Sequence, residues 1–121
     1  MLHYIANRNV YFRFDFNRLK EVFYNLLSNA IKFTKNKIIV KSFFDRNNAY
    51  FSVKDNGVGL KREELSSIFE KFYQTDIGKA LGGTGVGLSI VKEIVEAHGG
   101  KIKVKSVFGK GTEFIVSIPR K

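Results

Sequence analysis

The sequence contains no cysteine, so neither a disulfide framework nor a metal site built on thiolates can form. This absence suits a reducing compartment. No apolar run approaches the roughly 20 residues that a membrane-spanning helix needs. Residues 1–9 include the polar side chains of His3, Asn7, Arg8 and Asn9, so no signal peptide is expected. We therefore expect a cytoplasmic domain, and its parent protein can still be anchored to a membrane by other segments.

Internal repeats and low-complexity segments are also absent. The chain has 121 residues, which fits one domain spanning residues 1–121 and leaves little room for a second. Hydrophobic residues make up 44% of the chain, an ordinary value for a globular protein and too high for a disordered one. A domain of this length can bury a usable core.

Acidic residues are few: 11 Asp and Glu face 21 Lys and Arg, which gives a formal net charge of +10. Such a balance is typical of proteins with a polyanionic partner, such as nucleic acid, phosphate or a membrane surface. The positive charges are dispersed, however. The densest group, Lys101, Lys103 and Lys105, alternates along the chain and is followed by Lys110. Alternation predicts the solvent-facing side of a strand, so we expect no nucleic-acid partner.

Hydrophobic periodicity predicts helices in the first and third quarters of the chain and near its end. Asp15 stands at a helix N-cap position, and apolar residues at intervals of three and four then predict an amphipathic helix ending near Phe33. A second helix is expected over residues 87–98 and a short one over residues 63–69. Residues 74–83 contain three glycines and have no clear period, which predicts a mobile loop.

Runs of β-branched and aromatic residues predict strands, and two pairs of runs flank tight turns as hairpins. The expected strands are Leu2–Ala6, 10–14, 37–44, 50–54, Lys101–Val107 and 112–118. Strand pairs and helices mixed in this order indicate an α/β domain of the α+β type. We expect a two-layer sandwich in which one helical layer covers one sheet.

The first predicted helix carries Asn25, Asn29 and Lys32, whose spacing of four and three places them on one stripe. Carboxamide oxygens on one face can hold a hard cation together with water, and a lysine can meet phosphate oxygens. Asparagine is a poor helix residue that gains nothing on a solvated face. From these residues alone, a ligand site and a plain polar face both remain open.

The sequence Asp55-Asn56-Gly57-Val58-Gly59 follows directly after a predicted strand. Glycines without side-chain bulk let a flat ligand approach the backbone closely. The Asp55 carboxylate, at a strand end, can accept a hydrogen bond from an exocyclic amine such as that of adenine. The alternative is a simple turn, because Asp-Asn-Gly is also strong turn chemistry.

The sequence Gly82-Gly83-Thr84-Gly85-Val86-Gly87-Leu88 opens the helix predicted over residues 87–98. Bare backbone amides at a helix N-terminus form an anion site that suits a di- or triphosphate. No Gly-Lys-Ser/Thr follows, which excludes a Walker phosphate loop, and no compact strand-loop-helix-strand unit surrounds the run, which excludes a dinucleotide fingerprint. A flexible linker is disfavoured because a periodic helix starts immediately afterwards.

The two histidines show no catalytic setting. His98 stands at a predicted helix end before Gly99 and Gly100, where a histidine most often caps the helix. His3 has no acidic neighbour, and we assign it no role. Phe69 and Phe72 are expected in the core, and Tyr73 is expected to border the loop that follows.

Taken together, these motifs resemble the histidine-kinase branch of the gyrase, heat-shock chaperone, histidine kinase and MutL superfamily. The resemblance runs in order from Asp15 to Pro119. The segments that carry it are Asn25-Leu26-Leu27-Ser28-Asn29-Ala30-Ile31-Lys32-Phe33-Thr34 (asparagine box), Asp55-Asn56-Gly57-Val58-Gly59 (first glycine box), Ile68-Phe69-Glu70-Lys71-Phe72-Tyr73 (phenylalanine box), Gly83-Thr84-Gly85-Val86-Gly87-Leu88 (second glycine box) and Gly109-Lys110-Gly111-Thr112 (closing glycine motif).

The resemblance implies a Bergerat-type ATP-binding fold, in which about five strands of a mixed sheet lie under three helices. It implies that ATP and Mg²⁺ bind between the first helix and residues 74–83, with Asn29 as the metal ligand and Asp55 on the adenine amine. The residues expected at the nucleotide are Asn25, Asn29, Lys32, Phe33, Asp55, Gly57, Gly59, Tyr73, Lys79, Gly83, Thr84, Gly85, Val86, Gly87, Leu88 and Thr112.

Two departures from the family pattern bear on activity. The histidine box, an acceptor histidine followed by an acidic residue on a long helix, is absent from this sequence, so we expect no catalytic residue and no phosphoacceptor within it. Many relatives have an arginine directly after the position of Tyr73, where this sequence has Gln74. Lys79 is a candidate to replace that arginine.

The resemblance implies transfer of the γ-phosphoryl group of Mg-ATP to a histidine on separate dimerisation helices, for onward transfer to a response regulator. The isolated domain is expected to be a monomer that binds ATP without labelling itself. Three alternatives remain: an anti-sigma-type serine kinase, a gyrase-like hydrolase, and a non-enzymatic binding module. The first two relatives have a glutamate base where this chain has Asn25, which speaks against water activation.

Overall fold

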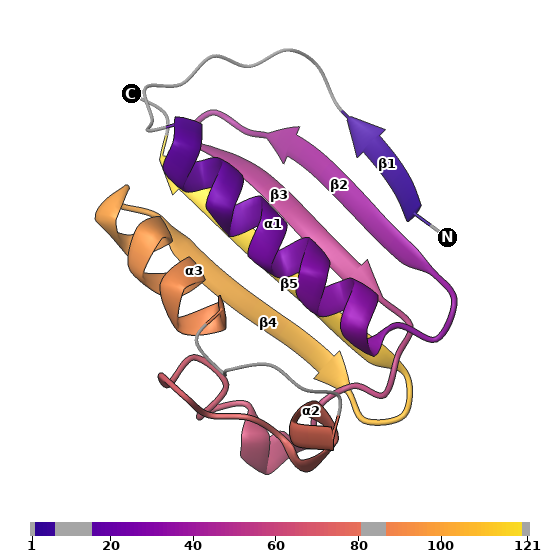
Figure 1. The fold of residues 1–121 in the computed structure, drawn as a ribbon. Coiled ribbons are helices and arrows are strands. Elements are labelled where there is room, and N and C mark those ends of the chain that lie inside the picture. Colours follow the sequence, from indigo (N-terminus) through magenta and orange to yellow (C-terminus); the bar gives the residue numbers. More distant parts are fainter. Residues whose placement is uncertain (1, 7–15, 81–86, 120–121) are drawn as a thin grey trace.

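The computed structural model describes residues 2–6, 16–80 and 87–119, and these form one five-stranded sheet with two long helices on one face (Figure 1). The strands are β1 (Leu2–Ala6), β2 (Ile38–Phe44), β3 (Asn48–Asp55), β4 (Lys101–Val107) and β5 (Gly111–Pro119). The helices are α1 (Phe16–Phe33), α2 (Asp76–Ala80) and α3 (Gly87–Ala97). No described helix is long and apolar enough to cross a membrane.

The strand order β1-β2-β3-β5-β4 places the last strand of the chain inside the sheet and β4 at its edge. β1 runs parallel to β2, and the other neighbours are antiparallel. The β3–β5 register pairs Asp55 with Thr112. The end of β3 and the start of β5, which are far apart in the sequence, therefore lie side by side at one end of the sheet.

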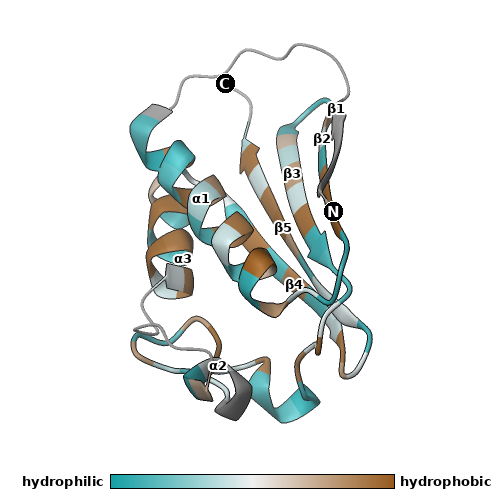
Figure 2. Cartoon of the chain, turned by 45° about the vertical axis from the view of Figure 1, so that its right-hand side comes forward, coloured by the Kyte–Doolittle hydropathy of each residue, from teal (hydrophilic) through white to brown (hydrophobic). Residues whose placement is uncertain are grey.

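The core lies between the sheet and the two long helices, as the brown residues on the inner sides of α1 and α3 indicate (Figure 2). Every second residue of β5, from Thr112 to Ile118, is buried. The buried apolar residues are Val22, Leu26, Ala30, Ile38, Val40, Val53, Ile68, Val91, Ile94, Val95, Phe114, Val116 and Ile118. A strand that buries one face has this period of two, and a helix that buries one face has a period near 3.6. With the core between one sheet and one helical layer, the predicted two-layer α+β sandwich is confirmed.

The local structure differs from the prediction in the segment that follows β3. A helix over residues 63–69 is wrong: the structure has a single 3₁₀ turn at Arg62–Glu64, followed by turns. Backbone amides there bond three residues back, as in Ser67 to Glu64 and Glu70 to Ser67. These turns bring Ile68 into the core. Phe69 packs against the core as expected, but the prediction that Phe72 lies in the core is wrong, because its side chain is exposed.

The predicted loop over residues 74–83 contains α2. Within the described residues there are thus three α-helices, of which α1 and α3 lie on the sheet. α2 lies beyond the end of the sheet with the turns that precede it (Figure 1). The predicted strand over residues 10–14 and the N-cap at Asp15 lie outside the described residues. The end of α1 at Phe33 is confirmed, and α3 ends one residue before the predicted end.

Candidate functional site

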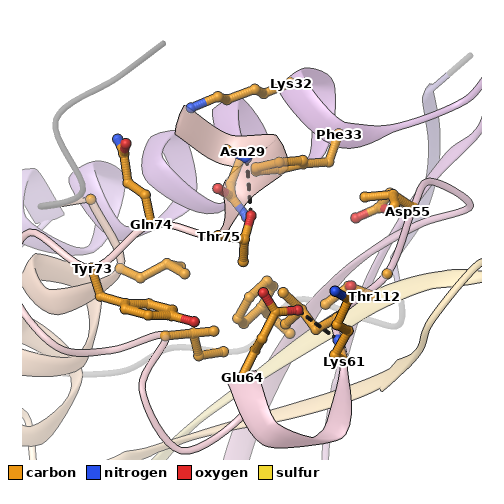
Figure 3. Close-up of a pocket in the computed structure, with 18 of the residues that line it drawn as sticks. Asn29, Lys32, Phe33, Asp55, Lys61, Glu64, Tyr73, Gln74, Thr75 and Thr112 are labelled. Carbon is orange, nitrogen blue, oxygen red and sulfur yellow. Dashed lines mark hydrogen bonds between the residues drawn. The ribbon is translucent and has the colours of Figure 1, made fainter. Parts of the chain in front are cut away.

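A cavity of about 310 Å³ opens at the end of the sheet where β3 ends and β5 begins. This volume lies at the lower limit for small-molecule sites. α1 forms one side of the cavity, and the ends of β3 and β5 another. The loop and turns that follow β3, Gly78 of α2, the start of α3 and Phe108 in the β4–β5 turn form the rest (Figure 3). Residues from separate parts of the sequence thus converge on one space.

Asp55 lies in the floor of this cavity at the last position of β3. Its side chain is only 5% exposed. Burial raises the pKa of its carboxyl group above its ordinary value, because a buried carboxylate loses hydration, while hydrogen bonds from the backbone amides of Gly57 and Thr112 partly offset the rise. A buried acceptor at the bottom of a cavity is suited to a ligand that brings a hydrogen-bond donor.

Gly57 and Gly59 are required by the close approach of other segments to the loop after β3. A Cβ on Gly57 would overlap the backbone carbonyl of Phe33 at the end of α1. Gly59 has a φ of +72° and faces the carbonyl of Val107, which leaves no space for a side chain. These contacts hold the loop against α1 and the β4–β5 turn. Gly59 itself lines the cavity, and Gly57 supports the wall from behind.

Asn56 ties the same loop to the connection between α1 and β2. Its side-chain Oδ1 accepts hydrogen bonds from the Thr34 hydroxyl at 3.1 Å and from the backbone amides of Asn36 and Lys37 at 3.1 and 3.0 Å. Its Nδ2 donates to the Asn36 side chain at 2.7 Å. One carboxamide thereby pairs with several polar groups of the segment that connects α1 to β2, and it holds this connection against the loop after Asp55.

Ser106 links three parts of the site although it is not among the residues that line the cavity. Its hydroxyl oxygen accepts a hydrogen bond from the Leu60 amide at 2.7 Å. It also lies 2.9 Å from the Gly111 carbonyl, to which it donates, and 2.8 Å from the Thr112 hydroxyl. The position of the Thr112 side chain, which lines the cavity, therefore depends on Ser106.

The polar stripe of α1 faces the cavity, as the sequence predicts. Asn25, Asn29, Lys32 and Phe33 all line it. The Asn25 Oδ1 lies 3.6 Å from where a Cβ on Gly87 would stand, so it faces the first residue of α3. The stripe and the N-terminal end of α3 thus border the same part of the cavity, which is the arrangement that suits an anion.

The donor set also fits a hard cation shared with a phosphate ligand. Within the described residues, no group of three or more His, Cys, Asp or Glu side chains could hold a metal ion by itself. Two amide oxygens on α1 line the cavity, and amide oxygens are ligands that Mg²⁺ accepts when ligand phosphates and water complete its octahedral shell. The site therefore fits a Mg²⁺ ion that arrives with its nucleotide.

Most of the predicted site residues with described positions converge here. The predicted residues that line the cavity are Asn25, Asn29, Lys32, Phe33, Asp55, Gly59, Tyr73, Gly87, Leu88 and Thr112. Gly57 lies behind the wall. Lys79 is exposed on α2 and is not a lining residue, whereas Gln74, the position at which many relatives have arginine, lines the cavity. Gly83, Thr84, Gly85 and Val86 lie outside the described residues.

Sequence reasoning missed the apolar walls of the cavity and part of its rim. The missed lining residues are Ser28, Val58, Leu60, Lys61, Glu64, Ile68, Thr75, Gly78, Phe108 and Phe114. Val58 and Leu60 lie within or next to the first glycine box, so their position was the available signal. The sequence around Phe108 and Glu64 contains no signal of a site, because only the fold brings these residues to the cavity.

The prediction that His98 caps a helix is confirmed. Its ring Nδ1 lies 2.9 Å from the carbonyl oxygen of Ile94 and donates to it, and its backbone amide bonds to the same oxygen at 3.2 Å. A histidine held in this way satisfies the last carbonyls of α3. It does not line the cavity.

Comparison with known proteins places the chain in a defined group. The sequence model of the family described as "Histidine kinase-, DNA gyrase B-, and HSP90-like ATPase" matches residues 14–121. The chain is 41% identical over 119 residues to the circadian input-output histidine kinase CikA of Synechococcus elongatus, covering 95% of this chain and 16% of that protein. It is 37% identical over 123 residues to the sensor histidine kinase WalK of Bacillus subtilis, covering 97% of this chain and 20% of that protein.

Solved structures show the same fold. The structure of full-length ShkA in complex with AMPPNP aligns with a TM-score of 0.87 at 30% sequence identity, over 98% of this chain and 25% of that one. The curated relatives are much longer than this chain, which spans 16% of the length of CikA and 20% of the length of WalK. What is similar is one domain of larger proteins.

Proposed function

Because this chain belongs to the family of histidine kinase-, DNA gyrase B- and HSP90-like ATPases, we propose that it is the ATP-binding catalytic domain of a sensor histidine kinase. Its reaction is transfer of the γ-phosphoryl group of Mg-ATP to a histidine on a separate dimerisation domain, for onward transfer to a response regulator. The observation that carries this proposal is the buried Asp55 carboxylate in the floor of a cavity whose opposite side is the Asn25–Lys32 stripe.

The adenine end of the cavity is proposed at Asp55 and Thr112. The Asp55 carboxylate accepts a hydrogen bond from the exocyclic amine, and the apolar side chains of Val58, Leu60 and Ile68 cover the flat ring. Tyr73 and Phe33 border the ribose and phosphates from the other side. Few polar groups in an otherwise apolar cavity fix the orientation of a ligand, and a carboxylate that faces an amine selects adenine over a base with a carbonyl there.

The phosphates are proposed at the other end, beside α1 and the start of α3. Lys32 supplies a positive charge, and the positive end of the helix dipole at the start of α3, beginning near Gly87, suits phosphate oxygens. Asn29 would hold the Mg²⁺ ion, which supplies charge neutralisation at the phosphates, and Asn25 would lie beside it at the phosphates. Residues 83–86, expected to contribute amides here, remain a prediction.

These residues bind and orient the nucleotide, and the rate advantage of the domain would come from positioning and charge stabilisation. Among the described residues that line the cavity, none at the phosphate end is a base for water. The acidic residues that line the cavity are Asp55 and Glu64. Asp55 is buried at the adenine end, and the Glu64 carboxylate accepts a hydrogen bond from the Lys61 amide at 2.7 Å. This distribution favours transfer to a protein acceptor over hydrolysis.

The partners follow from the proposed reaction. An acceptor histidine must come in line with the terminal phosphate. His98 caps α3 and does not line the cavity, and in the sequence His3 has no acidic neighbour. The acceptor is therefore placed on dimerisation helices that lie outside this sequence. The domain is expected to be monomeric and to act from the cytoplasm.

The experiment that tests this function incubates the domain with γ-labelled ATP, alone and with the dimerisation helices of a similar kinase as a separate protein. Acid-labile label on the histidine of the added protein, and none on the domain alone, is the expected result. Acid-stable label on a serine-containing partner would support the anti-sigma-type serine kinase. Release of labelled phosphate without transfer would favour the hydrolase.

A further inference from the structure

The face of the sheet opposite α1 and α3 carries a second hollow of about 530 Å³, which we call the open-face groove. Its lining includes Phe43, Tyr50, Lys101, Lys103, Lys105 and Ile115. Both long helices lie on the other face (Figure 1), so no described helix covers this groove. None of these residues lines the nucleotide cavity.

Lysines border the groove along the edge strand β4. Lys101, Lys103 and Lys105 are exposed, while Ile102 and Val104 between them pack against the core. The predicted solvent-facing side of this strand is thus confirmed. The register places Lys103 opposite Ile115, and Lys101 opposite Ser117, so this lysine row stands beside the floor of the groove.

More positive charge stands on the same face of the neighbouring strands. Lys41 on β2 pairs with Ser52, and Ser52 pairs with Ile115, which puts Lys41 in the same row as Lys103. Lys54 is exposed on β3 and pairs with Glu113, the one acidic residue that β2, β3, β4 and β5 direct to this face. None of the five lysines forms an ion pair within the described part of the chain. The charge is therefore available to a partner.

The other side of the groove is aromatic and fixed in place. The Phe43 and Tyr50 rings stack with centroids 4.8 Å apart and an interplanar angle of 13°. Phe43 is 42% exposed. The Tyr50 hydroxyl donates to Asp45 at 2.8 Å, which holds the ring against its neighbour. The groove therefore combines a rigid apolar side with a basic side.

We propose that the open-face groove docks an acidic amphipathic helix of a protein partner. Neighbouring strands lie about 4.8 Å apart, so β3, β5 and β4 span about 10 Å, close to the diameter of an α-helix. Lysines two residues apart on β4 stand about 6.7 Å apart. Acidic residues one turn apart on a helix, with Cβ atoms about 6 Å apart, match that row. The apolar stripe of the helix would then meet Phe43 and Ile115.

Two other polyanions fit this surface less well. Single-stranded nucleic acid binds sheets through rings that lie open for base stacking, but Phe43 and Tyr50 stack on one another. A bilayer is flat on this scale, whereas the lysines of β4 and the aromatic pair line a concave surface. A convex helix fills a concave groove.

The groove and the nucleotide cavity lie on opposite faces of shared strands. On β5, Thr112 and Phe114 line the cavity, and Ile115 and Ser117, facing the other way, line the groove. A docked helix therefore leaves the nucleotide site open. Failure of this proposal would not affect the proposed kinase function.

The test uses a synthetic acidic helix of about 18 residues, with glutamate at every fourth position and leucine on the adjoining stripe. Binding of the fluorescently labelled peptide to the domain is followed by anisotropy, and its position by amide chemical shifts. The expected result is shifts along β4 and at Phe43, with affinity that falls as salt rises. Shifts confined to the helix face, or no binding, would overturn the proposal.

Charge-matched variants separate the groove from the general charge of the domain. The triple variant K101E/K103E/K105E is expected to weaken peptide binding by about tenfold or more. The triple variant K20E/K35E/K92E changes exposed lysines elsewhere by the same net charge and is expected to have a smaller effect. Phe43→Ser, which keeps the charge, is also expected to weaken binding. ADP affinity, unchanged in all three variants, confirms that each is folded.

Two competitors complete the test. Vesicles containing phosphatidylserine and a single-stranded thymidine oligonucleotide are titrated under the same conditions. If either binds through the β4 lysines more tightly than the peptide does, the proposal of a helical protein partner is overturned in favour of that polyanion. Equal loss of peptide binding in both lysine triples would likewise reject the groove.

Discussion

The backbone amide of Gly57 donates a hydrogen bond to the Asp55 Oδ1 at 2.8 Å, two residues back along the chain. This bond folds the loop after β3 under the carboxylate and holds the group in the floor of the cavity. Since Gly57 also packs against the carbonyl of Phe33, the same glycine fixes the distance between the carboxylate and the end of α1. One short loop therefore fixes the Asp55 carboxylate relative to the end of α1.

Asp55→Asn is expected to weaken ADP binding by about tenfold to a hundredfold, because the amide can present a donor to the adenine amine and leave a buried group mispaired. Isothermal titration of the variant with Mg-ADP measures this. Asp45→Asn is the matched control, since the Asp45 carboxylate also accepts backbone amides, at the distant β2–β3 turn. Equal ADP affinity of D55N and wild type would remove Asp55 from the site.

The raised pKa of Asp55 predicts a pH dependence of stability. The folded state holds this proton more tightly than the unfolded chain, so the carboxyl group favours folding below its ordinary pKa of 3.8 and loses that contribution as pH rises through the folded value. The free energy of unfolding of wild type, relative to that of D55N, should therefore decrease as the pH rises from about 4, near the ordinary pKa of an aspartate, toward neutrality. Urea titrations of the nucleotide-free proteins across that range measure it, and a constant difference would contradict the buried charge.

Asn29→Ala is expected to reduce the enhancement of ATP affinity by Mg²⁺, because the variant loses an oxygen that lines the cavity. ATP titrations with Mg²⁺ and with EDTA give this enhancement as a ratio. Asn17→Ala serves as the control, since Asn17 is exposed on the same helix and does not line the cavity. A ratio in the Asn29 variant equal to that of wild type would exclude a metal role.

Ser106→Ala is expected to lower the free energy of unfolding by about 1–3 kcal/mol, because the Leu60 amide and the Thr112 hydroxyl lose their shared partner. Weaker ADP binding should accompany the loss, since Thr112 lines the cavity. Thermal unfolding with and without ADP measures both effects. The matched change Ser117→Ala, far from the cavity, should affect neither, and a similar response in both serine variants would refute the specific link.

Much of the fold could be predicted because its pattern is local. The α1 stripe of Val22, Leu26 and Ala30 has helical spacing, and β5 alternates strictly, so the sequence alone predicts which faces are buried. The segment around Ile68 was predicted as a helix, but the structure has a 3₁₀ turn and further turns there. Only the need to bring Ile68 into the core and then reverse the chain at Phe72, with a φ of +68°, selects those turns.

The residues of the site also fall into those that a local sequence pattern identifies and those that only the fold brings together. Asn25, Asn29 and Asp55 lie within compact motifs, so the sequence identifies them. Phe108, Glu64 and Ser106 depend on the order β3-β5-β4, which brings distant segments together and which no local pattern determines. The open-face groove is also invisible in the sequence, because the alternating lysines of β4 become one side of a groove only when β5 and β3 pair beside them.

The most direct test of the account compares the affinities of the domain for Mg-ADP and Mg-IDP in one calorimetric experiment. IDP replaces the adenine amine by a carbonyl, which would set two acceptors against one another at Asp55. The account predicts that ADP binds at least about tenfold more tightly than IDP, and that D55N reduces this preference. Equal affinities of the wild-type domain for the two nucleotides, or no binding of either, would contradict the assignment of the cavity as an adenine-nucleotide site.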